Sequence, residues 1–206
     1  MIGLIEAAAG RGVSRGTFDR LQDYVTLILA ENTRQNLISS ATATDIWERH
    51  IADGAQLIRF APRPDSSWLD IGSGAGLPGM VIAILSNGPV TLVEPRRLRA
   101  DFLIRAVAHL ALSDRVTVRA VKAERITGKF DVITARAVAS VGVLLSISRH
   151  LSTDKTVWLL PKGKSAQLEL EEARRSWQGS FRLEPSVTSQ EASILVASDV
   201  RRKGRG

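Results

Sequence analysis

The stretch Trp68-Leu-Asp-Ile-Gly72-Ser-Gly-Ala-Gly-Leu-Pro-Gly79 decides the fold of this chain. Its first four residues predict a short buried strand, and the glycines that follow predict a turn whose backbone a ligand can approach closely. Pro78 suits the first turn of a helix, because a proline there loses no hydrogen bond. The apolar run 80–85 continues that helix. Together these features predict the first βα unit of a nucleotide-binding α/β domain.

The chain after this stretch alternates apolar runs with helical patterns, which predicts a mostly parallel sheet covered on both faces. The expected strands are 67–71, 90–94, 116–121, 130–135, 156–160, 181–187 and 192–198. The expected helices are 78–87, 96–110, 138–150 and 165–177. The sequence therefore predicts an α/β fold with a seven-stranded sheet.

The residues before the stretch predict an N-terminal helical extension. One helix ends near Asn32 and carries an apolar stripe formed by Phe18, Leu21, Val25 and Ile28. A second helix is expected from Thr44, as its N-cap, to Phe60. We therefore expect a helical extension at 1–64, a core domain at 65–200 and a disordered basic tail at 201–206.

The composition narrows the class of protein. The 206 residues are 44% hydrophobic, enough for one full core, and include no cysteine, which excludes disulfides, thiolate-bound zinc and a thiolate nucleophile. We expect a cytoplasmic protein, because the chain shows neither a secretory signal nor a membrane-spanning segment. Its 28 Lys and Arg exceed its 21 Asp and Glu, giving a net charge of +7. Most of these cations are arginines, which favours a nucleic-acid partner, although arginine is also abundant in proteins from GC-rich genomes.

The residues around the glycine turn distinguish between nucleotide cofactors. Residues 74–79 match the dinucleotide pattern G-x-G-x-x-G, which is a weak signal by itself. Asp70 lies two positions before Gly72, and an anionic side chain suits the sulfonium and ammonium groups of S-adenosylmethionine better than a pyrophosphate. A P-loop is excluded, because Gly163-Lys164-Ser165 has Trp158 where that motif needs its first glycine.

Two further acids follow the next expected strands. Glu94 ends the second strand, 22 residues after Gly72, where a carboxylate accepts hydrogen bonds from ribose hydroxyls, unless it is an exposed strand-end acid. Glu124 follows the third strand and is placed to accept from an adenine amino group, and Ala123 leaves room for the ring. These acids and the turn residues Gly74 and Gly76 favour a class I S-adenosylmethionine-dependent methyltransferase, a Rossmann-like fold, over a dehydrogenase.

The second N-terminal helix carries a polar group with two interpretations. Arg49 and Asp53 are four residues apart and His50 and Asp53 are three apart, so their side chains lie together on a helix surface. One interpretation is a surface ion pair beside a partly buried histidine. The other places His50 and Asp53 at the edge of the cofactor cleft.

Several of these motifs, in this order, resemble a known family: the bacterial 16S rRNA guanine-N7 methyltransferases called RsmG or GidB. The family's usual Arg-His-Ile-Leu-Asp-Ser is altered at Ala52 and Gly54, and many members have Asp where this chain has Glu94. The residues that carry the resemblance are Asn36-Leu37, Arg49-His50-Ile51 with Asp53, Asp70 to Gly79, Arg99 with Phe102-Leu103, Ala135-Arg136-Ala137 with Ala139-Ser140, and Lys162-Gly163.

The resemblance implies methyl transfer from S-adenosylmethionine to a guanine N7 of 16S rRNA, at guanine 527 in the loop of helix 18. It implies that Gly72 and Leu77 contact the cofactor, that Ala123 and Glu124 hold the adenine, and that Arg136 lies where cofactor and substrate meet. A structural salt bridge is the alternative role for Arg136. The expected partner is 16S rRNA or the small-subunit particle, with no metal and a monomeric protein.

The residue types present agree with this reaction. The absence of cysteine excludes covalent methylation of pyrimidine C5, and the fourth strand lacks the Asn-Pro-Pro-aromatic motif associated with methylation of exocyclic amines. Guanine N7 carries no proton, so alignment and exclusion of water suffice. Asp53, His50 and Arg136 are the candidates that orient the guanine. The alternatives are a non-catalytic RNA-binding or ribosome-assembly protein on this fold and an NAD-dependent oxidoreductase.

Overall fold

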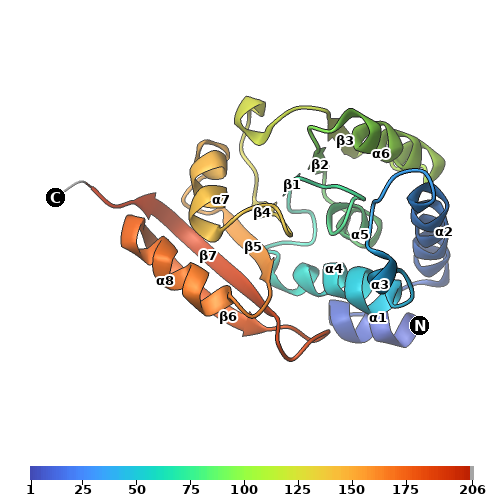
Figure 1. The fold of residues 1–206 in the computed structure, drawn as a ribbon, viewed down its shortest axis with the longest axis horizontal. Coiled ribbons are helices and arrows are strands. Elements are labelled where there is room, and N and C mark those ends of the chain that lie inside the picture. The colour runs from blue at the N-terminus through green and yellow to red at the C-terminus, as the bar shows by residue number, and fades with distance from the viewer. Residues whose placement is uncertain (205–206) are drawn as a thin grey trace.

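The centre of the molecule is a seven-stranded sheet with the strand order β3-β2-β1-β4-β5-β7-β6 (Figure 1). The computed structural model describes residues 1–204. Strands β1 to β5 are parallel to one another, and β7 runs antiparallel to both β5 and β6. This confirms the mostly parallel α/β fold. The strands are β1 (Trp68–Ile71), β2 (Val90–Val93), β3 (Val116–Arg119), β4 (Val132–Thr134), β5 (Val157–Lys162), β6 (Trp177–Pro185) and β7 (Ser193–Arg202).

Helices cover both faces of the sheet. Successive side chains of a strand point to opposite faces, and apolar side chains point to both, so each face needs a helical layer. Trp68 of β1 belongs to a core cluster shared with α1 (Ile2–Ala9), α2 (Arg15–Asn32), α5 and α6. Leu69 and Ile71 belong to a second cluster shared with α7 and α8. The helical elements of this part are α5 (Gly79–Leu85), α6 (Arg97–His109), η3 (Ala123–Arg125), α7 (Val141–Ser148), η4 (Arg149–Leu151) and α8 (Ala166–Ser176).

The N-terminal helices lie on the first of these faces (Figure 1). The expected stripe is confirmed, since Leu21, Val25 and Ile28 of α2 are buried and Phe18 packs against the same cluster. The extension therefore completes the core beside α5 and α6. Its elements are α1 (Ile2–Ala9), α2 (Arg15–Asn32), α3 (Ser40–Ala43), the π-helix η1 (Trp47–Ala52), α4 (Asp53–Ala55) and the 3₁₀-helix η2 (Gln56–Phe60).

The start of the second predicted helix was wrong. Thr44 has helical backbone angles, φ −67° and ψ −34°, so it is not an N-cap. Helical structure begins four residues earlier at Ser40, after Ser39 with an extended backbone. Ser, Thr and Ala alternate through this segment, so several residues offered the same capping signal. Helix α1 was not predicted either, because a single short apolar run shows no periodicity.

The C-terminal strands correct one boundary of the predicted tail. Arg201 and Arg202 belong to β7 and pair with Gln178 and Trp177 of β6, so the tail does not begin at residue 201. Backbone pairing along the edge strand orders these two arginines despite their charge. The last two residues, 205 and 206, lie outside the described part. Within the described residues, no helix is both long and apolar enough to cross a membrane.

Candidate functional site

The glycine turn connects the end of β1 to the start of α5. Gly72 and Ser73 donate their backbone N–H groups to the carbonyl of Val93, at 2.8 and 3.0 Å, which attaches the turn to the tip of β2. Gly76 has a φ of +80°, and a Cβ there would lie 2.6 Å from Met80 and 2.8 Å from Leu103. The turn therefore requires glycine at this position for its backbone angle and for space.

Asp70 lies beneath the turn, where it is 1% exposed. Its Oδ2 accepts a hydrogen bond of 3.1 Å from the N–H of Gly79, the first residue of α5, whereas its Oδ1 has no hydrogen-bond partner. Burial raises the pKa of this carboxyl from 3.8 to about 7, although the hydrogen bond from Gly79 opposes the shift. Asp70 thus supports the start of the helix and keeps one oxygen for a further donor.

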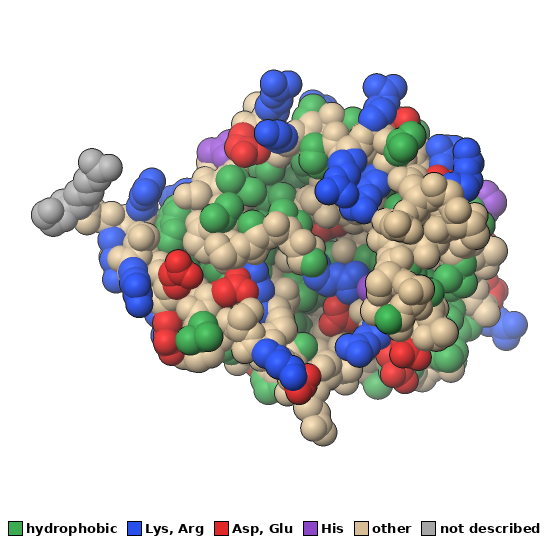
Figure 2. Space-filling model, viewed as in Figure 1, with side chains coloured by type: hydrophobic (Ala, Val, Ile, Leu, Met, Phe, Trp, Pro, Cys, Tyr) green, Lys and Arg blue, Asp and Glu red, His purple; other side chains and the backbone are tan. Residues whose placement is uncertain are grey.

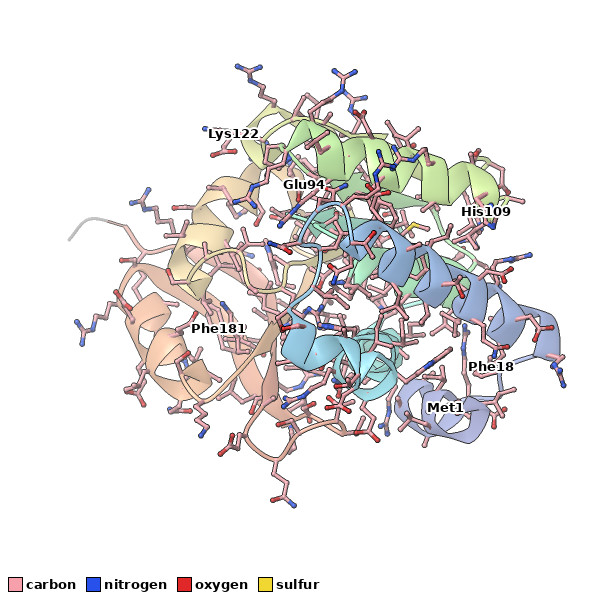
Figure 3. The ribbon with its side chains drawn as sticks, turned by 45° about the vertical axis from the view of Figure 1, so that its right-hand side comes forward. Met1, Phe18, Glu94, His109, Lys122 and Phe181 are labelled. Atoms are coloured by element: carbon pink, nitrogen blue, oxygen red, sulfur yellow. The ribbon has the colours of Figure 1, made fainter. Side chains whose placement is uncertain are left out.

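Glu94 connects the turn to the chain after β2. It is 3% exposed, and its carboxylate accepts from the N–H of Gly74 at 2.9 Å and from that of Arg96 at 2.8 Å. This excludes the exposed strand-end acid considered from the sequence. Each carboxylate oxygen accepts more than one hydrogen bond, so the group retains capacity for a hydroxyl. Figure 3 shows Glu94 in the upper part of the molecule, further inward than Lys122.

The two residues expected at the adenine lie in η3, directly after Lys122. Ala123 is buried at 4% exposure, whereas Glu124 is exposed. Leu77, within the turn, is also buried, at 6%. The structure thus groups Asp70, Gly72, Gly74, Gly76, Leu77 and Glu94 around one turn and places Ala123 and Glu124 on a neighbouring segment.

Tyr24 of α2 is a contact to the turn that the sequence analysis missed. Its hydroxyl donates to the carbonyl of Ala75, in the middle of the turn, and its side chain is fully buried. Burial raises the pKa of this phenol well above its ordinary value, and nearby Asp70 adds to the shift. The tyrosine therefore stays protonated and remains a donor. On the sequence, no local pattern distinguishes Tyr24 from other buried residues of the apolar stripe.

A second polar group lies at the end of β4 and centres on Arg136. Its guanidinium donates to Asp53 Oδ2 at 3.1 Å, to His50 Nδ1 at 2.8 Å and to the carbonyl of Arg49 at 3.0 Å. The structure therefore brings together the three residues expected to orient the guanine. Asp53 forms its salt bridge with Arg136, whereas the sequence spacing suggested Arg49 as its partner.

The contacts of His50 determine its tautomer. An arginine donates hydrogen bonds and accepts none, so Nδ1 facing Arg136 carries no proton. The proton is then on Nε2, which lies 3.1 Å from Thr42 Oγ1. Burial, and then the charges of Arg136 and Arg49, lower the pKa of His50 from 6.5 to about 4. His50 is therefore a neutral support for Arg136.

A cavity of about 590 Å³ opens beside this group. Asp53 and Arg136 line it, His50 does not, and Figure 2 shows acidic and basic side chains meeting in a hollow at the centre of this face. Val138 also lines the cavity, and its side chain lies against Gly72, so the cavity adjoins the glycine turn. The remaining walls come from Lys162 at the end of β5, from Lys164 just after it, from Glu169 of α8, and from the β6–β7 loop.

Comparison with known proteins agrees with this arrangement. A family model described as rRNA small subunit methyltransferase G matches residues 17–195. The chain belongs to this family. It is 49% identical over 197 residues to ribosomal RNA small subunit methyltransferase G of Rhizorhabdus wittichii, covering 94% of this chain and 91% of the relative. It is 44% identical over 201 residues to the protein of the same name in Zymomonas mobilis, covering 93% and 90%.

The fold of this chain is also similar to that of solved methyltransferase structures outside the family. The glycopeptide N-methyltransferase MtfA, complexed with sinefungin, is 10% identical with a TM-score of 0.61, covering 72% of this chain and 93% of that one. A ribosomal protein L11 methylase from Lactobacillus delbrueckii is 16% identical with a TM-score of 0.56, covering 76% and 80%. At these identities the likeness shows the methyltransferase fold alone. No group of three or more potential metal-ligating side chains occurs within residues 1–204.

Proposed function

We propose that this member of the methyltransferase G family transfers a methyl group from S-adenosylmethionine to N7 of a guanine in 16S rRNA, with guanine 527 as the target. The family match over residues 17–195 carries this proposal, because it includes both the glycine turn and the Arg136 group. The adjoining positions of turn and cavity support it, since donor and acceptor must meet.

The turn fits S-adenosylmethionine, which supplies an electrophilic methyl group when bound. Asp70 has an unpartnered, buried Oδ1 for the cofactor's positive charge, and Glu94 has remaining capacity for ribose hydroxyls. Gly72, Gly74, Gly76 and Leu77 provide the backbone that borders the cofactor, and Ala123 and Glu124 border the adenine.

The cavity fits a guanine nucleotide, and its residues act by orientation. N7 attacks through an in-plane lone pair that carries no proton, so no side chain serves as a base. Arg136 can donate to O6 of the guanine and leave the N7 lone pair free, and His50 and Asp53 hold the guanidinium in position. The purine gains positive charge as the methyl arrives, and the carboxylate of Asp53 offsets it.

The surroundings of the cavity fit RNA as substrate. Arg49 and Lys164 line its wall and are suited to phosphate contacts. We further propose that the protein acts as a monomer in the cytoplasm, where ribosomal RNA is found. The rRNA is presented either alone or within a small-subunit particle.

The test is methylation by the purified protein. Small-subunit particles or 16S rRNA from cells that lack this gene are incubated with the protein and S-adenosylmethionine, and nuclease digests are analysed by mass spectrometry. We expect 7-methylguanosine at a single position. No product, together with no heat of cofactor binding by calorimetry, would favour the non-catalytic RNA-binding alternative.

A further inference from the structure

The β6–β7 loop, residues 186–192, forms part of the wall of the cavity that Lys162 and Arg136 also line. Ser186, Thr188 and Ser189 line the cavity, whereas Val187 is 55% exposed. The loop closes on itself through Ser186 N–H to the carbonyl of Ala192 at 3.0 Å. This local bond shapes the loop but does not fix its distance from the rest of the site.

Gln56 fixes that distance. This residue of η2 is 1% exposed, and its side-chain amide bridges two parts of the molecule. Its Oε1 accepts from the N–H of Val187 at 2.9 Å, and its Nε2 donates to Ser186 Oγ at 3.1 Å and to Asp53 Oδ1 at 2.8 Å. A buried amide with its hydrogen bonds satisfied permits one arrangement of its neighbours and penalises others.

Thr188 makes a second connection between the loop and the Arg136 group. Its hydroxyl donates to Asp53 Oδ1 at 3.1 Å, while Oδ2 of the same carboxylate accepts from Arg136. Asp53 is therefore held from two sides, by the loop and by the guanidinium. A shift of the loop would remove one of the two hydrogen bonds to Oδ1 of the carboxylate that positions Arg136.

We propose that Gln56 and Thr188 are positioning residues that hold the β6–β7 loop as the outer wall of the acceptor pocket. The inference rests on the function proposed above and names the part of the chain that selects the acceptor. The walled cavity of about 590 Å³ is of the size that encloses one small ligand. Its ligand is a single nucleotide turned out of the RNA, since a base stacked in a helix cannot reach Arg136 within the cavity.

The test compares matched variants in the full chain. Thr188→Val removes the hydroxyl at nearly constant volume, Thr188→Ser keeps it, and Gln56→Met removes the amide. Gln190→Met is the control, because Gln190 is an exposed residue of the same loop and does not line the cavity. The readouts are KM and kcat with a short RNA hairpin carrying the target guanine, and the Kd of S-adenosylmethionine by calorimetry.

We expect Thr188→Val and Gln56→Met to raise KM for the RNA about tenfold, as expected for loss of one or two positioning hydrogen bonds. Thr188→Ser should recover most of that loss, Gln190→Met should stay within about twofold of the parent protein, and cofactor Kd should change less than about twofold.

Other results would overturn the inference. Equal KM values for the parent, Thr188→Val and Thr188→Ser proteins would exclude a positioning role, even if Gln56→Met failed to fold. Equal losses of cofactor and RNA affinity would assign the two residues to general stability. A parent protein that forms no 7-methylguanosine on 16S rRNA or on small-subunit particles either would instead refute the proposed function itself.

Discussion

Arg136 illustrates at the scale of a single residue why a lysine cannot replace an arginine at this site. Its planar guanidinium reaches an acid, an imidazole nitrogen and a backbone carbonyl at the same time. The pKa of His50, lowered to about 4, leaves that imidazole neutral and able to accept at Nδ1 at physiological pH. Asp53, His50 and the carbonyl of Arg49 therefore hold the Arg136 guanidinium in place, and His50 adds no second positive charge beside it.

Replacing Arg136 by lysine should lower kcat. A single ammonium cannot maintain all three contacts with the same geometry, so Asp53 and His50 lose their common partner. We expect kcat to fall by about 10- to 100-fold, because the reaction depends on alignment. Steady-state kinetics checks this, with Arg15→Lys, at an 87% exposed side chain, as the control. An unchanged kcat would show that Arg136 only provides a structural salt bridge.

Asp70 makes stability depend on pH. Its pKa is raised to about 7 in the folded protein, so between about pH 4 and pH 7 the unfolded chain releases this proton first. Folding stability from this group therefore falls as pH rises through that window, by at most about 1.4 kcal/mol per pH unit. Asp70→Asn removes this ionisation.

Urea unfolding of the wild type and Asp70→Asn at pH 5 and pH 8 tests this sign. The wild type should lose stability relative to the variant at the higher pH, and comparing the two proteins cancels the titration of other groups such as His50. Asp23→Asn, at an exposed carboxyl, is the control. A difference that does not change with pH would show that Asp70 titrates normally.

At the scale of the secondary-structure elements, α2 supports the glycine turn through Tyr24. The helix packs on the same core cluster as α5, and its tyrosine reaches the carbonyl of Ala75. The N-terminal extension is thus part of the turn's support. The effect of the Tyr24 hydroxyl on cofactor binding can be measured separately from its effect on the free energy of unfolding.

Tyr24→Phe should weaken cofactor binding. The ring still fits, but the carbonyl of Ala75 loses its donor, so the turn becomes less ordered. We expect the Kd of S-adenosylmethionine to rise about fivefold and the unfolding free energy to fall by about 1 kcal/mol. Ser148→Ala is the control, because it removes a buried hydroxyl that binds Trp158 and the carbonyl of Leu144, away from the turn. Equal Kd values for both variants would contradict the role of Tyr24.

The elements differ in how well the sequence predicted them. The glycine turn and its flanking strand and helix were predicted because their signals are contiguous between Trp68 and Gly79. The π-helix η1 was not, because its sequence carries the same apolar spacing as an α-helix. Strand β6 begins at Trp177, where the preceding helix was expected to end, since propensity alone does not define boundaries.

At the scale of the whole molecule, the site depends on contacts between residues far apart in the chain. Tyr24 and Ala75 are 51 positions apart, and Asp53 and Thr188 are 135 apart. Local patterns cannot indicate such contacts, so Tyr24, Gln56 and Thr188 were missed. Arg136 was anticipated on two grounds only. It follows the fourth expected strand, and its motif Ala135-Arg136-Ala137 resembles that of a known family.

The topology also separates two basic positions, Arg96 after β2 and Arg202 at the end of β7. The cavity lies at the carboxyl end of β5, where Lys162 pairs with Ser193. Strand β7 runs antiparallel to β5, so it ends near the amino end of β5, beyond the Val157–Ser198 pair. Arg202 therefore lies at the opposite end of the strands from the cavity. Arg96 instead follows β2, at the carboxyl ends of the parallel strands, where the glycine turn also lies. A short RNA bound at the cavity therefore meets Arg96 before it meets the tail.

The salt dependence of RNA binding tests this separation. Each phosphate contact adds about one to the slope of log affinity against log salt concentration. We expect Arg96→Ala to reduce that slope by about one and Arg202→Ala to leave it unchanged, with the same short hairpin as ligand. Fluorescence anisotropy between low and moderate salt measures the slope, and calorimetry with S-adenosylmethionine confirms an intact cofactor site. A larger loss for Arg202→Ala than for Arg96→Ala would place the RNA at the opposite end of the strands, and the cavity would then contact it only through a much longer substrate.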